Sequence, residues 1–335
     1  GGSAVGMYAF ARQEFRREAA FLAGASYLFG PYLLTVVYLR GGLAEGLAFV
    51  WMPLCLLAFR KAAKGGRASI VGGAACLAAL ILTHNITAML FVPVALAYSV
   101  VAGWRERGAW RGLAISAVLG LGLSAFFWVP ALAERGFVRM EQVVADRYQY
   151  WHNFAHPSNL WDITGEMTNP LTEDGVCLTL GGLQILLALS SLWMLAWPGT
   201  RRRCTLFFWL LLAAALFMTF SSSRPVWTVL SPLRYVQFPW RLMGICSLSL
   251  ACLGGAGLEA ILAEGKSRRS IGSWLPLASF ALVVPSLVAW VNGTQNLLTL
   301  PLVGLTLALG GALHLAGRQR VASNVAGRGI VPLFC

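Results

Sequence analysis

In the stretch YLRGGLAEGLAFVWMPL, residues 38–54, two ionisable residues lie between two apolar segments, just before the second of them. Arg40 and Glu45 lie at this junction, and we predict a helix over residues 44–60. A helix needs about 20 apolar residues to cross the hydrocarbon core of a bilayer. Runs of about this length recur along the whole sequence. The pattern therefore predicts an all-α polytopic membrane protein.

The composition agrees with a chain that lies largely in lipid. Of the 335 residues, 58% are hydrophobic and 12% are charged, whereas soluble domains carry about 25% charged residues. The seven cysteines lie mostly within apolar runs, and none forms a CxxC pair. Because free cysteine is among the most buried residue types, we expect these thiols to pack as small apolar side chains.

The apolar runs predict a bundle of about ten or eleven helices. The first is the end of a helix that stops near Arg12, so we expect the sequence to begin inside a longer protein. One loop, residues 132–176, is much longer than the others and is predicted to be external. We expect a transmembrane helical domain over residues 1–317 and a cytoplasmic tail, or a truncated continuation, over 318–335. Besides 44–60, the predicted helices are 18–37, 68–86, 87–103, 112–131, 177–197, 204–220, 241–262, 273–291 and 298–316.

The charged residues indicate the topology of the chain. The formal net charge is +13, and basic residues gather in short loops such as RKAAKGGR at 60–67 and RRR at 201–203. Short basic loops are typical of the cytoplasmic side of membrane proteins. With these loops in the cytoplasm, the predicted helices alternate in direction, and we expect membrane lipids, not nucleic acid, as partners. The arginines on the outer side are then Arg40, Arg135, Arg139, Arg147, Arg224, Arg234 and Arg241.

Two of the outer arginines flank an aromatic segment, LSPLRYVQFPWRLM, at residues 230–243. Tyr235 and Trp240 are typical anchors at the boundary between lipid and water, so the segment can be purely architectural. Arg234 and Arg241, however, oppose the usual charge distribution, and arginine binds phosphate well through its planar fork of donors. Arg241 is also predicted to head the next helix, where free N–H groups attract anions. The segment is therefore a candidate site for a lipid-linked phosphate.

Two further helix junctions carry candidate substrate-binding residues. At the first, Arg40 and Glu45 lie where charges tend to form pairs or to mark a substrate path. The alternative is an arginine that extends to the surface and a glutamate favoured by the helix dipole. At the second, His84 and Asn85 follow an apolar run within THNITA. A histidine there is either a structural hydrogen-bonding partner or a group that titrates near neutral pH.

The predicted external loop offers a candidate metal site. His152 and His156 lie four residues apart, a spacing that places two ligands on one face of a helix. The residues between them contain no HExxH glutamate, and Pro157 follows directly. A third ligand and a base are therefore not assigned, and a divalent metal is the one cofactor that we consider.

Three motifs together resemble one family. YLRGGLAEGLAFVWMPL (38–54), LTHNITAML (82–90) and YVQFPWRLM (235–243) are similar, in the same order, to motifs of a bacterial family of multi-pass membrane proteins. That family is described as 6-pyruvoyl-tetrahydropterin synthase-related, and the resemblance covers about residues 20–245. The family looks related to the YfhO-type proteins and, more distantly, to GT-C glycosyltransferases. Nothing in the sequence resembles a soluble pterin synthase or its zinc-binding histidines.

The resemblance implies a GT-C-like bundle of transmembrane helices in the cytoplasmic (inner) membrane of a bacterium. Such enzymes take a sugar from a polyprenyl-phosphate donor on the extracytoplasmic side, during envelope or glycan assembly. The expected partner is then a lipid-linked sugar phosphate, held near Arg234 and Arg241, with Arg40 as a third cation. The usual catalytic base is an Asp or Glu in the first external loop. That loop would precede Gly1, so no catalytic residue is assigned.

Two other classes of function are compatible with the sequence. A transporter or flippase for a lipid-linked or anionic solute uses helices that are broken by glycine or proline, and Pro31, Pro53, Pro93 and Pro130 interrupt predicted helices. The polar residues, however, lie mainly at the outer ends of helices. A non-catalytic membrane scaffold is the third class, and it predicts that the outer arginines are dispensable.

Overall fold

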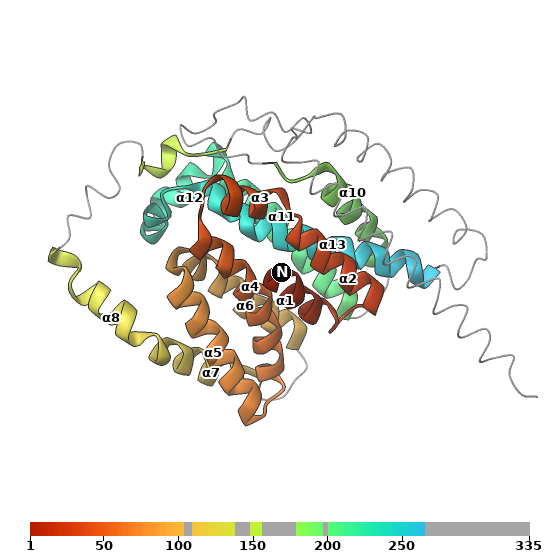
Figure 1. Cartoon of the computed structure of the whole chain (residues 1–335), viewed down its shortest axis with the longest axis horizontal. Coiled ribbons are helices and arrows are strands. Elements are labelled where there is room, and N and C mark those ends of the chain that lie inside the picture. Colours follow the sequence, from red (N-terminus) through yellow and green to blue (C-terminus); the bar gives the residue numbers. More distant parts are fainter. Residues whose placement is uncertain (104–108, 138–147, 156–178, 197–199, 265–335) are drawn as a thin grey trace, which may run out of the picture.

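The computed structural model describes residues 1–103, 109–137, 148–155, 179–196 and 200–264, which fold into a bundle of helices (Figure 1). Within these ranges there is no β-strand. The α-helices are α1 (Gly2–Ala11), α2 (Arg17–Leu28), α3 (Pro31–Leu34), α4 (Leu43–Ala63), α5 (Arg67–Thr83), α6 (Asn85–Gly103), α7 (Ala109–Leu123), α8 (Ala125–Ala133), α10 (Gly182–Ser190), α11 (Thr200–Thr219), α12 (Arg224–Val229) and α13 (Met243–Glu264). Two short turns matter for the site, the π turn η1 (Thr35–Leu39) and the 3-10 turn η9 (Pro239–Leu242).

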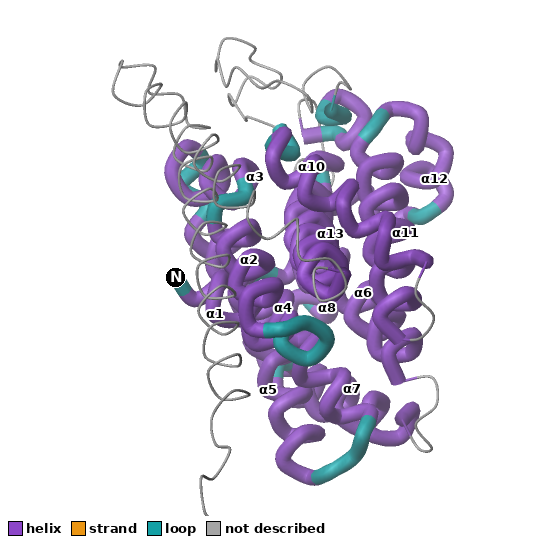
Figure 2. The backbone as a smooth tube through the Cα atoms, turned by 90° about the vertical axis from the view of Figure 1, so that its right-hand side faces the viewer, coloured by secondary structure: helices purple, strands orange, loops and turns teal. Residues whose placement is uncertain are grey.

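Helix α13 forms the centre of the bundle. It packs against α2, α10 and α11, and Figure 2 shows it among these helices. In an 18-residue apolar window of Pro239–Ala263, 89% of the residues are buried, against 33% to 44% in the corresponding windows of the other three long apolar helices. The many Gly, Ala and Ser residues of α13 permit this enclosure, because small side chains let neighbouring helices approach closely.

Helix α4 organises the other half of the bundle. It packs against α1, α5, α6 and α7. The contact with α7 is close, since a Cβ at Gly112 would collide with the backbone carbonyl of Ala62. Glu45 lies at the beginning of α4 and Arg60 near its end, so that this helix connects two polar clusters at opposite ends of the bundle.

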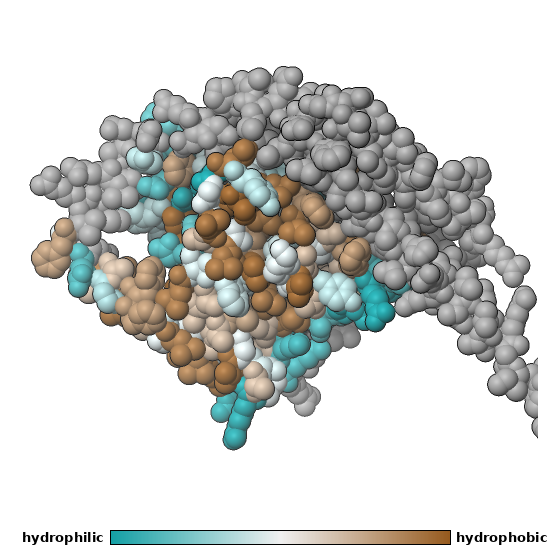
Figure 3. Space-filling view, viewed as in Figure 1, coloured by the Kyte–Doolittle hydropathy of each residue, from teal (hydrophilic) through white to brown (hydrophobic). Residues whose placement is uncertain are grey.

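The described residues contain four helices that are long and apolar enough to cross a membrane, or up to six if each of two bent pairs is one span. The four are Leu43–Ala63, Asn85–Gly103, Arg201–Thr219 and Pro239–Ala263. Figure 3 shows a broad apolar surface over the bundle, with hydrophilic residues mainly around its margins. Exposed side chains such as Val71 and Val118 contribute to the apolar surface. An apolar surface of this kind suits contact with lipid. The polytopic helical architecture is therefore as predicted.

The predicted helix 18–37 is not continuous. It consists of α2 and, after a bend of 42°, α3 with η1. Pro31 has no N–H group and disfavours helical geometry in the residue before it, and Gly30 has a ψ angle of 128°. The break redirects the chain so that η1 packs beside α4.

The predicted helix 112–131 is also divided, into α7 and α8 with a bend of 68°. At the bend, the Ser124 hydroxyl donates to the carbonyls of Gly120 (3.0 Å) and Leu121 (3.2 Å). The indole N–H of Trp128 also donates to Leu121 (3.0 Å). Side-chain donors that compete for helix carbonyls favour such bends. Helix α8 then continues to Ala133, past residue 132, where the external loop was predicted to begin.

Other boundaries differ by smaller amounts. The predicted helix 177–197 is shorter, because α10 gives way to a 3-10 turn over Ser191–Ala196. The predicted boundary between helices at residues 86 and 87 lies at His84. The predicted helices 273–291 and 298–316 lie outside the described residues. So do the domain boundary at 317 and the tail, and the total of ten or eleven helices stays a prediction.

A described piece of the long loop, residues 148–155, packs onto α12. The ring of Tyr150 stacks on Trp227, with 5.5 Å between the ring centres. Its hydroxyl lies 3.1 Å from the Thr228 hydroxyl. The N–H of Ala155 donates to the carbonyl of Thr219 at 3.0 Å. These contacts hold this part of the loop against the segment that connects α11 to α13.

Candidate functional site

A π turn and a left-handed glycine position Arg40. The N–H of Arg40 donates to the carbonyl of Thr35, five residues back, at 3.0 Å. Gly41 follows with a φ angle of 60°, a conformation that glycine adopts without steric cost. The N–H of Gly42 then donates to the carbonyl of Val36 at 2.8 Å. This sharp reversal directs the Arg40 side chain toward the first turn of α4, and π turns of this kind are frequent at functional sites.

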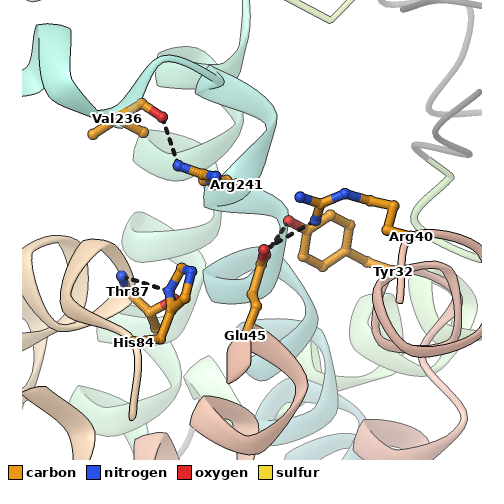
Figure 4. A network of polar contacts seen from close by, with 7 residues as sticks. All are labelled: Tyr32, Arg40, Glu45, His84, Thr87, Val236 and Arg241. Atoms are coloured by element: carbon orange, nitrogen blue, oxygen red, sulfur yellow. Dashed lines mark hydrogen bonds and ion pairs between the residues drawn. The ribbon is translucent and has the colours of Figure 1, made fainter. Parts of the chain in front are cut away.

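Glu45 is the buried acid of the site. Its side chain is 6% exposed. Its carboxylate accepts hydrogen bonds from the hydroxyl of Tyr32 (2.6 Å) and from Nη1 of Arg40 (2.9 Å) (Figure 4). Glu45 also lies in the first turn of α4, where the helix dipole favours negative charge. The predicted ion pair is therefore present and the glutamate is favoured by the helix dipole, but Arg40 does not extend to the surface, since its side chain is 18% exposed.

Trp240 and Arg241 complete the site from η9. The guanidinium carbon of Arg40 lies 4.4 Å from the centre of the buried Trp240 ring. Arg241 donates from Nη1 to the carbonyl of Val236 at 2.9 Å (Figure 4). Its guanidinium carbon lies 5.1 Å from the ring centre of Phe238. Nε of Arg241 is buried and has no hydrogen-bond partner among the described residues. The guanidinium group of Arg241 is thus held in place by Val236 and Phe238, while its Nε–H can still donate a hydrogen bond.

His84 lies between α5 and α6 and caps the second of these helices. Its backbone carbonyl accepts the N–H of Ala88 at 3.0 Å. Its Nδ1 accepts the N–H of Thr87 at 3.1 Å and lies 2.8 Å from the Thr87 hydroxyl. A side-chain acceptor at this position satisfies one of the free N–H groups in the first turn of a helix. The structural role considered for this histidine is therefore present.

The environment of His84 keeps its imidazole neutral. Burial lowers the pKa of His84 below its ordinary value of 6.5, Arg241 and Arg40 lower it further, and Glu45 opposes them. Because the unfolded chain titrates near the ordinary value, it binds more protons than the folded protein at pH values just below 6.5. The stability contributed by neutral His84 is therefore complete above that pH and is lost as the pH falls toward the folded-state pKa.

We expect a measurable pH effect from this residue. Between pH 7.5 and pH 5.5, thermal unfolding in detergent should shift to lower temperature for the wild-type protein. The shift should be smaller for His84→Asn, which keeps a capping oxygen but has no titrating ring. Equal shifts in the two proteins would contradict this assignment.

Two of the ionisable side chains, those of Glu45 and Arg241, line a narrow pocket. Thr87 also lies in its wall, and its cavity volume is about 10 Å³. Two guanidinium groups, those of Arg40 and Arg241, here interact with the single carboxylate of Glu45. These side chains therefore leave one positive charge without a partner, in a setting where unpaired charge is costly. The remaining wall residues are Phe49, Met52, Leu90, Gly244 and Ile245.

The structure brings together residues from three separate motifs of the sequence, and it places others at the surface. Arg234 and Tyr235 are exposed and contact each other, with 3.1 Å between Nη2 of Arg234 and the Tyr235 hydroxyl. Asn85 is exposed as the first residue of α6. The prediction that Arg241 heads a helix is corrected. Helix α13 begins two residues later, and the N–H of Arg241 donates to Phe238 at 3.0 Å.

Tyr32 and Thr87 are site residues that the sequence interpretation missed. Tyr32 is almost fully buried in α3, and a buried tyrosine hydroxyl usually has a hydrogen-bond partner. That requirement, together with the break expected at Pro31, was the available signal. Thr87 lies three residues after His84, which is the spacing of an N-cap contact.

The described residues hold no group of three or more His, Cys, Asp or Glu side chains that could bind a metal ion. His152 accepts a hydrogen bond at Nε2 from Trp151 at 3.1 Å. His156, its proposed partner, lies outside the described residues, so the metal site stays a prediction.

A second polar cluster lies at the other end of α4. Arg60, whose side chain is 12% exposed, forms an ion pair with Glu14, which is 9% exposed. Nη1 of Arg60 also donates to the Tyr98 hydroxyl at 3.3 Å. Nearby, the fully buried carboxylate of Glu259 lies 3.3 Å from Nε of Arg16 and 3.2 Å from Nη1 of Arg201. These pairs tie the connection between α1 and α2 to α4, α11 and α13.

The fold and the site define a polytopic helical membrane protein with a cluster of two arginines and one glutamate at one end of its bundle. A sequence profile of the family described as 6-pyruvoyl-tetrahydropterin synthase related domain, a membrane protein, matches residues 2–294. The chain belongs to this family, as its three motifs indicated. No curated protein matches the chain.

Proposed function

We propose that this protein takes part in glycosyl transfer from a polyprenyl-phosphate sugar on the extracytoplasmic side of a bacterial inner membrane, during envelope or glycan assembly. In this proposal the donor's phosphate binds between Arg40 and Arg241. The observation that carries it is the charge balance of the cluster formed by Arg40, Glu45 and Arg241, in which two guanidinium groups interact with one carboxylate. A phosphate would supply the missing negative charge.

The two arginines have different roles in this proposal. Within the described residues, Nε of Arg241 has no hydrogen-bond partner and Nη1 donates to the neutral carbonyl of Val236, so Arg241 is the cation available to an incoming anion. Arg40 is already paired with Glu45 and contributes mainly its position beside Trp240. When the sugar leaves the phosphate, charge develops on the phosphate oxygens, and fixed cations stabilise that charge. Arg234 and Tyr235, at the surface of the same segment, are candidates for contact with the rest of the head group.

Glu45 is a positioning residue and not the general base. Its two oxygens accept hydrogen bonds from Tyr32 and Arg40, which leaves it poorly placed to remove a proton from an acceptor hydroxyl. Its function is to hold Arg40 over Trp240. A carboxylate elsewhere would serve as the base.

The orientation rests on the distribution of basic residues. The pocket lies at the N-terminal end of α4, where Glu45 is in the first turn of the helix. Arg60 and Lys61 lie in the last turn of α4, at the opposite end. Placing the basic end in the cytoplasm follows the usual charge distribution of membrane proteins. The pocket then faces the extracytoplasmic side, where lipid-linked sugars are used in the proposed reaction.

Arg241→Ala should reduce binding of a polyprenyl monophosphate by at least about tenfold, because it removes charge-assisted hydrogen bonds to the phosphate. Binding is measured on the purified protein in lipid nanodiscs, with the uncharged polyprenol as the reference ligand. Arg241→Lys, which keeps the charge, should retain part of the affinity.

The matched control is Arg67→Ala, which removes an exposed arginine at the basic end. It should leave the affinity unchanged. Equal binding of polyprenol and polyprenyl phosphate to the wild-type protein would disprove the phosphate site. Phosphate binding without sugar transfer, in membranes supplied with polyprenyl-phosphate-linked sugars, would exclude the catalytic part alone.

A transporter or flippase is the second candidate, and the two bent pairs of helices favour it. Transporters use broken helices where irregular backbone lines a substrate path, and the pairs α2–α3 and α7–α8 are bent by 42° and 68°. In this case reconstituted protein would move a polyprenyl phosphate across the bilayer of a liposome, without sugar transfer.

A further inference from the structure

The helix cap fixes which nitrogen of His84 carries the proton. Nδ1 receives the backbone N–H of Thr87 at 3.1 Å and lies 2.8 Å from the Thr87 hydroxyl, which can either donate or accept. Because the N–H group can only donate, this cap requires a lone pair on Nδ1. A proton on Nδ1 would oppose that N–H group and leave it unsatisfied in the first turn of α6. A neutral imidazole protonated at one nitrogen only must then carry its proton on Nε2.

The other ring nitrogen lies on the side of the imidazole that faces Glu45 and Arg241 (Figure 4). The charged groups that act on the ring are Glu45 from α4, Arg40 after η1 and Arg241 from η9. Two of these three are cations, and they disfavour a charged imidazolium. The ring is therefore a neutral donor next to an excess of positive charge.

We infer that His84 is a tautomer-locked hydrogen-bond donor, which presents Nε2–H to an oxygen of the phosphate bound at Arg241, and that it is not a general base. This inference rests on the proposed phosphate site. Because Nδ1 is occupied by the cap and Nε2 already holds a proton, neither nitrogen is free to accept one from a substrate hydroxyl. His84 thus selects for an acceptor-rich group bound beside Arg241 and positions that group.

Two substitutions separate the cap from the donor. In His84→Asn, the side-chain oxygen can accept the Thr87 N–H in place of Nδ1, but the shorter side chain does not reach the position of Nε2. In His84→Gln, the amide nitrogen can occupy the position of Nε2, while the cap is lost. We expect His84→Asn to keep its thermal stability and to bind polyprenyl monophosphate about tenfold more weakly. We expect His84→Gln to retain affinity within about threefold and to unfold about 2–4 °C lower.

The tautomer itself can be observed without a ligand. Two-bond ¹⁵N–¹H correlations of histidine-labelled protein in detergent should show, at pH 7, an unprotonated Nδ1 and a protonated Nε2 for His84. The signal is assigned by its absence in His84→Asn. A proton on Nδ1 would overturn the inference.

The binding results test the role of His84 separately from the proposed phosphate site at Arg241. Unchanged affinity in His84→Asn, with lost affinity in Arg241→Ala, would disprove the role of His84 and leave the phosphate site standing. Absence of phosphate-dependent binding in the wild-type protein would disprove both. Weaker binding in His84→Asn with retained binding in His84→Gln supports the donor role, since a purely structural role predicts the reverse order.

Discussion

Glu45→Ala should destabilise the protein by about 3 kcal/mol, because it leaves the Arg40 guanidinium without its anion. Arg40 cannot easily move into water, since its side chain is 18% exposed and lies over Trp240. The substitution also removes the acceptor of the buried Tyr32 hydroxyl. The measurement is reversible unfolding in detergent micelles. Glu134→Ala, which removes an exposed carboxylate, is the control and should change stability by less than about 0.5 kcal/mol.

A triple substitution tests whether this cluster serves function or only stability. Replacing a buried ion pair by apolar residues of similar size is often neutral or stabilising. Tyr32→Phe, Arg40→Met and Glu45→Leu together should therefore recover most of the stability lost in Glu45→Ala. The triple variant should bind polyprenyl monophosphate weakly, because Arg40 is replaced and only the guanidinium group of Arg241 is left to contact the phosphate. Wild-type affinity in the triple variant would show that the cluster is only structural.

The sequence was sufficient to single out the ionisable residues of this cluster. Ionisable side chains at the ends of apolar helices are rare, so Arg40, Glu45, His84 and Arg241 were conspicuous. The same reasoning predicted the long helices α4, α6, α11 and α13, whose apolar runs are uninterrupted by strong helix breakers or tolerate a single proline.

What the sequence did not show was how these residues face one another. Arg234 and Arg241 were expected to act together, but Gln237 between them has a φ angle of 64°. A left-handed residue that is not glycine is set by tertiary contacts and leaves little trace in local sequence. The π turn before Arg40 and the side-chain contacts that bend the chain at Ser124 are similar cases. The bend at Pro31 brings Tyr32 within hydrogen-bonding distance of Glu45.

Arg60→Ala should destabilise the opposite end of the bundle by about 3 kcal/mol, without affecting the pocket. The substitution leaves the carboxylate of Glu14, 9% exposed, without its cation, and an unpaired buried charge is strongly destabilising. Lys64→Ala, an exposed residue just after α4, is the control and should have little effect. Unfolding in detergent gives the stability, and polyprenyl monophosphate binding in nanodiscs reports on the pocket.

The expected independence of the two ends follows from their separation along α4. Glu45 and Arg60 are about 22 Å apart at 1.5 Å per residue, and substitutions at this distance usually contribute additively. If Arg60→Ala leaves phosphate affinity unchanged, and its effect on stability adds to that of Glu45→Ala, the pocket is a fixed site at one end of the membrane, as glycosyl transfer requires. If Arg60→Ala instead alters the affinity, the ion pairs at the basic end restrain a motion that reaches the pocket. Such coupling between opposite ends is what alternating access demands, and it would make transport the better explanation of the same two clusters.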